Sequence, residues 1–99
     1  MKSEIYEEVI MLPPIQTIET VKLLHEEVRH HFNRLGPIIV DASQVESIDT
    51  ASLQLLAILF QSSQQLAKTI TLNEPSSAFL EASHLLGLET LFGVPTEQV

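Results

Sequence analysis

The chain is 99 residues long, with 44% hydrophobic residues, 18% charged residues and a formal net charge of −8. This composition predicts one folded domain over residues 1–99, with a single modest core. Only five residues are Lys or Arg, which excludes the basic face that nucleic-acid backbones and anionic membranes require. The acidity instead favours a cationic partner surface, or serves solubility alone.

The cysteine content and the lengths of the apolar runs indicate which kinds of protein the chain does not resemble. The chain contains no cysteine, so it has neither a disulfide framework nor a thiolate metal site. The first residues, MKSEIYEE, lack the apolar stretch of a signal peptide. The longest apolar run, Leu55–Phe60, is far shorter than the ~20 residues that a membrane-spanning helix needs. We therefore expect a cytoplasmic protein that does not insert into a membrane.

The first third of the chain reads as a strand followed by a helix. Residues 4–12 are rich in β-branched and aromatic side chains, and Pro13 and Pro14 end this predicted strand. Thr17 is the predicted N-cap of the helix. Apolar residues then recur at three- and four-residue spacing along one helix face: Val21, Leu24, Val28, Phe32 and Leu35. Gly36 and Pro37 stop the helix.

The remaining chain repeats this alternation. Residues 38–40 form a continuous apolar run that is typical of a strand buried on both faces. A second helix is predicted from Asp49 or Thr50 to about Lys68, and residues 69–72 read as a strand. Pro75 and Ser76 open a third helix that stops at Gly87. The last predicted element, LETLFGV, is a short turn or an edge segment.

Strands that alternate with helices predict an α/β sandwich with a mostly parallel sheet, because parallel strands need crossover connections. The pairing direction of the first strand stays open at this stage.

Catalytic and metal-binding chemistry finds little support. Asp41 ends a predicted strand, where α/β folds often place functional groups, and Asp49 lies nearby. A phosphoryl-accepting or Mg²⁺ site would also need acidic residues after the first strand and a Lys after a later one, which are missing. Glu27 and His31 are four residues apart, but such a pair is more often a solvated contact on an exposed face.

No enzyme motif emerges either. His84 follows Ser83 in a predicted helix without a nucleophile turn, and the chain has only three glycines and no phosphate-binding loop. We therefore predict no catalytic residue, no metal ligand and no cofactor.

The stretch VESIDTASLQLLAI, residues 45–58, concentrates Asp49, Thr50 and Ser52 in front of an apolar run. One interpretation is a simple helix cap. The other is a switch, since a phosphoryl group here would add about −2 charge to a small hydrogen-bonding surface. Both interpretations stay open from the residues alone.

The span IIVDASQVESIDTASLQLL, followed by LNEPSSAFLEASHLLGLETLF, resembles the STAS domain family over about residues 8–94. The shared features are an apolar strand ending in Asp41 and Ala42, an apolar residue before an Asp-hydroxyl helix start, a strand leading to Pro75 and Ser76, and a Leu-Leu-Gly-Leu ending. The resemblance implies a mixed, mostly parallel sheet of four to five strands packed against helices.

The resemblance also implies a protein-binding switch rather than an enzyme. Anti-sigma factor antagonists of this family dock on a serine kinase and are released by phosphorylation at this helix start. Asp49 matches the Asp of the family pattern and Thr50 matches its first hydroxyl position. Ala51 occupies the usual acceptor position, and Ser52 replaces a common glycine.

By this resemblance, the phosphorylation candidates are Thr50 and, as backup, Ser52. The predicted docking face comprises Ser43, Asp49, Thr50, Ala51, Ser52 and Leu53. The protein partner would be an anti-sigma serine kinase or a chemotaxis component. The alternative is a phospholipid-transport ATPase, because its small STAS subunits carry Asp-Thr-Gly-Gly and use the Thr after the Asp.

Overall fold

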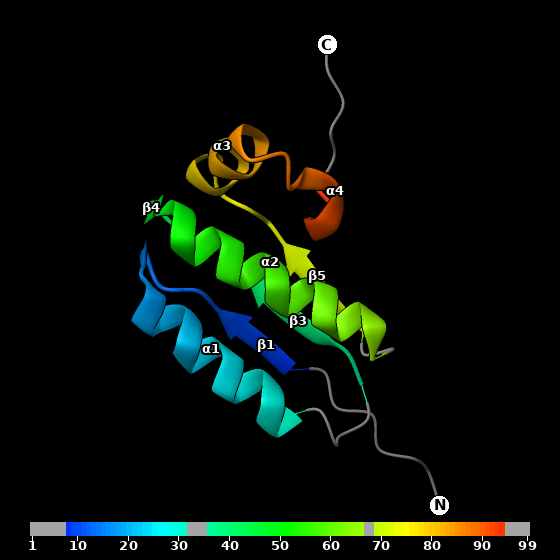
Figure 1. The fold of residues 1–99 in the computed structure, drawn as a ribbon. Helices are drawn as coiled ribbons and strands as arrows, with labels where there is room; N and C mark the ends of the chain where they lie inside the picture. The colour runs from blue at the N-terminus through cyan, green and yellow to red at the C-terminus, as the bar shows by residue number, and fades with distance from the viewer. Residues whose placement is uncertain (1–7, 32–35, 67–68, 95–99) are drawn as a thin grey trace, which may run out of the picture.

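The computed structural model describes residues 8–31, 36–66 and 69–94 (Figure 1). Strands and helices alternate as predicted. In chain order the elements are β1 (Glu8–Met11), β2 (Ile15–Gln16), α1 (Ile18–His31), β3 (Ile38–Asp41), β4 (Ser47–Ile48), α2 (Thr50–Gln65), β5 (Ile70–Asn73), α3 (Ser77–Leu85) and α4 (Glu89–Phe92). Within these ranges, no helix combines the length and the apolar character needed to cross a membrane.

The main sheet has three strands in the order β1-β3-β5. The apolar run predicted as a buried strand is the central strand β3, which pairs in parallel with both neighbours. Helix α1 makes the crossover from β1 to β3, and α2 makes the crossover from β3 to β5. The first strand, whose direction the sequence left open, is parallel to β3.

A second, two-stranded sheet was not predicted. In it, Ile15 of β2 pairs with Ser47 of β4, and Gln16 pairs with Ile48, also in parallel. The prediction of one mixed sheet of four to five strands is therefore wrong, since the described residues form two sheets of three and two strands with parallel pairing throughout. The sequence shows no alternation of apolar and polar residues that would predict β2 or β4, because each strand is only two residues long.

The small sheet positions the starts of the two long helices. Strand β2 leads directly into α1 and strand β4 directly into α2. The carbonyl oxygen of Pro14 accepts hydrogen bonds from the backbone N–H groups of Glu46 (2.7 Å) and Ser47 (3.1 Å). The two helices consequently begin side by side and run in the same direction (Figure 1).

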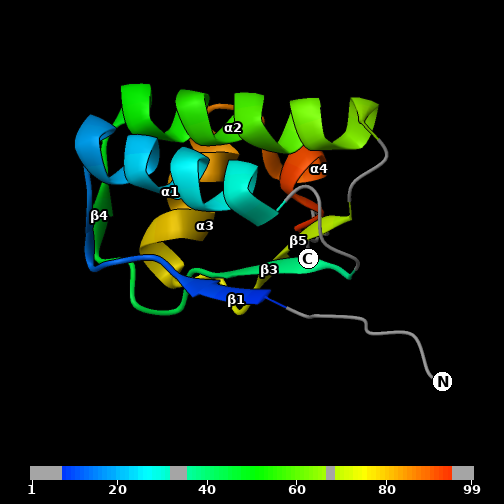
Figure 2. The same cartoon turned by 90° about the horizontal axis from the view of Figure 1, so that it is seen from below.

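Helices α1 and α2 lie over one face of the three-stranded sheet (Figure 2). Val21, Leu24 and Val28 of α1 are buried as the stripe predicted, whereas Phe32 and Leu35 lie outside the described residues. The segment LETLFGV, predicted as a short turn or an edge segment, contains the four-residue helix α4. Its Phe92 packs edge-to-face against Phe60 and Phe79, with ring centroids 5.1 and 5.3 Å apart, and closes the core.

Candidate partner-binding site at the start of α2

Asp49 is the N-cap of α2. Its backbone is extended, and its Oδ1 accepts a hydrogen bond from the backbone N–H of Ser52 at 2.7 Å. This bond stabilises the charged carboxylate and lowers the pKa of Asp49, with a smaller contribution from the Ser52 hydroxyl, which lies close without hydrogen-bond geometry. The helix start predicted at Asp49 or Thr50 is confirmed, and α2 ends at Gln65, before the predicted Lys68.

Thr50 and Ala51 form the exposed part of the first turn of α2. The backbone N–H groups of a first helical turn have no partner within the helix, and the helix dipole makes this end positive. The Thr50 hydroxyl therefore stands in solvent at a helix end that favours a nearby negative group. Ala51, at the family's usual acceptor position, offers only a methyl group to the same surface.

Ser52 and Leu53, in contrast, do not reach the surface. Both are 0% exposed, and the Ser52 Oγ has no hydrogen-bond partner among the described residues. The helical repeat of about 100° per residue places Ser52 on the face opposite Thr50. Leu53 lies only about 60° around the helix from Thr50, and it is buried because it packs into the hydrophobic core. The expectation that Ser52 accepts a phosphoryl group, and that both side chains line the docking face, is corrected. The Ser52 hydroxyl is inaccessible to solvent in the folded helix start.

Ser43 lies in the loop between β3 and β4 and is exposed. Its backbone N–H donates a hydrogen bond to Oδ1 of Asp41 at 2.8 Å. The hydroxyl and the backbone N–H of Ser43 lower the pKa of Asp41. Asp41 thus accepts a backbone hydrogen bond within a tight turn after β3. Within the described ranges, no three His, Asp or Glu side chains are arranged to hold a metal ion.

Ser76 holds the loop before α2 through hydrogen bonds, a role that its position at a predicted helix start does not indicate. Its Oγ caps α3 by accepting from the N–H of Phe79 at 3.1 Å. The same hydroxyl donates to the carbonyl oxygen of Val45 at 2.6 Å, and the Ser76 N–H donates to the carbonyl oxygen of Ala42 at 3.1 Å. The start of α3 is therefore bonded to both ends of the loop that carries Ser43.

The exposed face of α2 has no charged side chain. The helix sequence, TASLQLLAILFQSSQQ, contains no ionisable residue. Five of its exposed residues recur at three- and four-residue intervals on one face that continues from the helix start: Thr50, Gln54, Ile58, Gln61 and Gln65. The sixteen residues of the helix make this neutral face about 24 Å long. The neighbouring helix α1 exposes Glu19, Lys22 and Arg29 instead.

The histidines fall outside this site. His31 is buried rather than solvated, and its Nδ1 lies 3.7 Å from Oε1 of Glu8 instead of pairing with Glu27. The exposed His84 contacts the Glu89 carboxylate through Nδ1 at 2.5 Å. Although His84 follows Ser83 in the chain, the buried Ser83 Oγ has no hydrogen-bond partner among the described residues. The two side chains therefore do not form a pair of nucleophile and general base.

Comparison with known families decides the classification. A family model described as "Mlab, STAS domain" matches residues 9–94. The chain belongs to the STAS domain family. No curated protein and no solved structure gives a significant match. The match covers almost the same residues as the resemblance that the sequence motifs indicated. STAS domains are generally regulatory or binding domains without catalytic activity.

Proposed function

We propose that this STAS domain is a cytoplasmic regulatory domain of the anti-sigma factor antagonist type. It docks on a protein partner through a surface that we name the α2 face: Ser43, Asp49, Thr50, Ala51, and the exposed residues Gln54 and Ile58. The observation that carries the proposal is the exposed start of α2, continuous with a helix face that is solvent-accessible yet uncharged.

Beyond the Asp49 cap, the helical part of the α2 face has no charge, and this supports docking on energetic grounds. A helix face that only meets solvent normally carries charged side chains. The centre of a protein interface is depleted in charge, because burying an unpaired charge costs far more than burying an amide or a methyl group. Gln54 and Ile58 expose an amide and an aliphatic side chain in a protein of net charge −8. A partner can cover them without stripping water from an ion.

Control by phosphorylation is proposed at Thr50. Ala51 has no hydroxyl and Ser52 is buried, so Thr50 holds the exposed hydroxyl in the first turn of α2. A phosphoryl group there would add about −1.5 to −2 charge next to Asp49 and at the edge of the neutral surface. The positive helix end would accept this charge, but a partner that covers the α2 face would be displaced. The partner in this function is a serine kinase of the anti-sigma type or a chemotaxis component.

Site-specific photo-crosslinking tests the docking proposal. A photoreactive amino acid is placed at Ile58 on the α2 face and, as the matched control, at Glu26 on the exposed face of α1. We expect one protein to be captured from Ile58 and not from Glu26, and Thr50→Glu to abolish the capture. Equal capture from both helices, or capture that Thr50→Glu leaves unchanged, contradicts the proposed surface.

Phosphorylation needs its own measurement. The domain is incubated with ATP and the captured kinase, and peptides covering residues 45–65 are analysed by mass spectrometry. We expect modification at Thr50 in the unaltered chain and none in Thr50→Ala. If no residue is modified, the domain docks without a switch, and the regulatory part of the proposal fails.

The second candidate is a small structural subunit of a phospholipid-transport ATPase. The pairing of Asp49 with an exposed Thr50 favours it, because the STAS subunits of such ATPases use the Thr after the Asp. In this function the α2 face would clamp the nucleotide-binding subunit permanently. Identification of the crosslinked protein as a transporter ATPase, together with an unmodified Thr50, would favour the second candidate over the first.

A further inference from the structure

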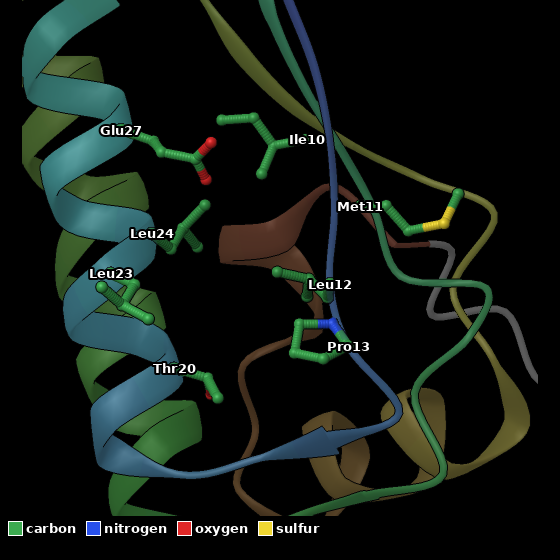
Figure 3. A pocket seen from close by; sticks show the side chains of 8 residues that line it. All are labelled: Ile10, Met11, Leu12, Pro13, Thr20, Leu23, Leu24 and Glu27. Atoms are coloured by element: carbon green, nitrogen blue, oxygen red, sulfur yellow. The ribbon is translucent and has the colours of Figure 1, made fainter.

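A pocket with a volume of about 180 Å³ lies between α1 and β1, on a different part of the domain from the α2 face (Figure 3). Leu12 and Leu24 supply apolar walls, and Leu23 stands on the helix side. Glu27 is the one charged residue in the lining, and its carboxylate points across the gap toward Ile10 (Figure 3). The pocket therefore combines an apolar interior with a single negative charge.

The strand beside this pocket is an edge of the sheet. Strand β1 pairs with β3 on one side, and no other described strand pairs with it. The backbone N–H of Glu8 donates to Pro37 at 3.1 Å and that of Leu12 donates to Asp41 at 2.9 Å. In a parallel pair, alternate residues bond to the same neighbour. The N–H and C=O groups of Val9 and Met11 consequently point away from β3, along the free edge.

Strand β1 is short and has Glu8 at its start, but its central residues Val9, Ile10 and Met11 carry no charge, proline or bulge that would block pairing. Strand β1 instead exposes Val9 by 55% and Met11 by 54%, while Leu23 on the adjoining helix is 66% exposed. Val9, Met11 and Leu23 thus present apolar surface on both sides of main-chain groups that pair with no other described strand.

The negative charge of the chain and of Glu27 indicates which kind of segment can occupy the edge of β1. A second copy of the chain would bring another net charge of −8 and another Glu27 to the same edge. An extended segment with a Lys or Arg would instead lay its aliphatic stem against Leu23 and Leu24 and bring its cation to the Glu27 carboxylate. Long basic side chains suit a pocket that is apolar inside and acidic at one wall.

We propose that β1 takes an extended segment of a partner protein as an additional strand, with a Lys or Arg side chain of that segment in the pocket beside Glu27. Main-chain hydrogen bonds to Val9 and Met11 supply the affinity, and the pocket supplies the selectivity for a basic residue. This surface is separate from the α2 face, so one STAS domain can bind one partner with α2 and a second segment with β1.

Peptide titration followed by amide NMR tests the proposal. The probes are two capped synthetic peptides, Thr-Val-Thr-Lys-Thr-Val-Thr and the same sequence with Glu in place of Lys, each at millimolar concentration. We expect the Lys peptide to shift the amide signals of Val9, Met11 and Glu27 and to bind about two- to five-fold more tightly than the Glu peptide, as one exposed ion pair allows. N-methylation of its backbone on the bonding edge should abolish the shifts.

Two variants separate the outcomes. Glu27→Gln changes an exposed side chain and should remove the preference for Lys while the peptide still binds. Thr50→Glu, which disables the α2 face, should leave peptide binding unchanged, so failure of one proposal is distinguishable from failure of the other. The inference is overturned if Val9 and Met11 do not respond, if both peptides bind equally to the unaltered domain, or if light scattering shows a concentration-dependent dimer that perturbs β1.

Discussion

The Oγ of Ser76 donates a hydrogen bond to the carbonyl oxygen of Val45 at 2.6 Å across 31 residues of sequence. Val45 is buried in the loop that leads from β3 to β4, whereas Ser76 caps α3 beyond the end of β5. One hydroxyl therefore satisfies a helix end and also fixes the loop that precedes α2. The shape of the α2 face depends on a helix that does not contribute to it.

Removing this hydroxyl should weaken both the fold and the site. Ser76→Ala loses the cap of α3 and leaves the Val45 carbonyl oxygen without this donor, so we expect the free energy of unfolding to fall by about 1–3 kcal/mol. Urea denaturation measures the change. The matched control is Ser77→Ala, which removes a neighbouring exposed hydroxyl and should cost less than about 0.5 kcal/mol. Equal effects of the two substitutions contradict the role of Ser76.

Local signals predicted the elements that matter most for the site. The apolar run of β3 and the Asp49 cap of α2 were both readable, because each depends on neighbouring residues alone. The absence of charge from residues 50–65 was also visible in the sequence, although its meaning emerged only when Gln54 and Ile58 proved exposed.

Other features depend on contacts between distant residues and could not be read. The pairing of β2 with β4 joins segments two residues long, and the bond from Ser76 to Val45 joins two loops. The burial of Ser52, in contrast, was predictable from the sequence, because the helical repeat places Ser52 on the face opposite Thr50. The hydroxyl cluster drew attention to residue type, whereas orientation decides which hydroxyl is accessible.

The stability contributed by the Asp49 cap should depend on pH. The folded state lowers the pKa of Asp49, so its ionised form is favoured by folding and contributes stability above the unfolded pKa of about 3.9. That contribution is lost as pH falls through the folded pKa. Asp49→Asn retains a capping group but no charge, so we expect the variant to be less stable near neutral pH and the difference to disappear in acid.

Urea denaturation of Asp49→Asn and the unaltered domain at several pH values between about 2.5 and 7 measures this difference. Asp41, whose pKa is also lowered, titrates in both proteins and cancels in the comparison. A stability difference that stays constant down to the lowest pH contradicts an ionised cap at Asp49.

Ser52 and Thr50 should respond in opposite ways to loss of their hydroxyls. The Ser52 Oγ is buried without a hydrogen-bond partner among the described residues, and replacing such a group with an apolar one of similar shape is nearly neutral or stabilising. We expect Ser52→Ala to change the free energy of unfolding by less than about 1 kcal/mol in either direction, because removing a buried unpaired hydroxyl offsets the loss of its smaller effect on the Asp49 carboxylate, and to leave any phosphorylation intact. Thr50→Ala should remove phosphorylation with little change in stability.

Denaturation and phosphopeptide mass spectrometry on the two Ala variants separate these roles. Ser52→Asp is the informative third variant, because an unpaired carboxylate at a fully buried position should destabilise the domain by several kcal/mol. A Ser52→Asp domain as stable as the unaltered one would mean that this side chain is accessible after all.

Phe92 should prove essential although it lies near the end of the described chain. Its ring contacts both Phe60 of α2 and Phe79 of α3, and it is only 3% exposed. Phe92→Ala should lower the free energy of unfolding by about 3–5 kcal/mol, a large part of the 5–15 kcal/mol typical of a small domain. Thermal unfolding measures the loss, with the exposed neighbour Thr90→Ala as the control.

A charge placed at Ile58 should disrupt docking without disturbing the fold. Ile58 is exposed in the middle of the neutral face, so Ile58→Glu and Ile58→Lys should each change stability by less than about 0.5 kcal/mol. Both should weaken partner binding by at least about ten-fold, because a partner that covers the α2 face would bury an unpaired charge of either sign.

Calorimetric titration with the crosslinked partner measures this effect, and Glu26→Lys on α1 is the matched charge change outside the proposed surface. If only Ile58→Glu weakened binding, long-range repulsion rather than burial would explain the result, and the proposed contact would end near Thr50. If Ile58→Glu and Ile58→Lys both weaken binding and Glu26→Lys does not, the partner contacts α2 from its start at least as far as Ile58, in the middle of the helix.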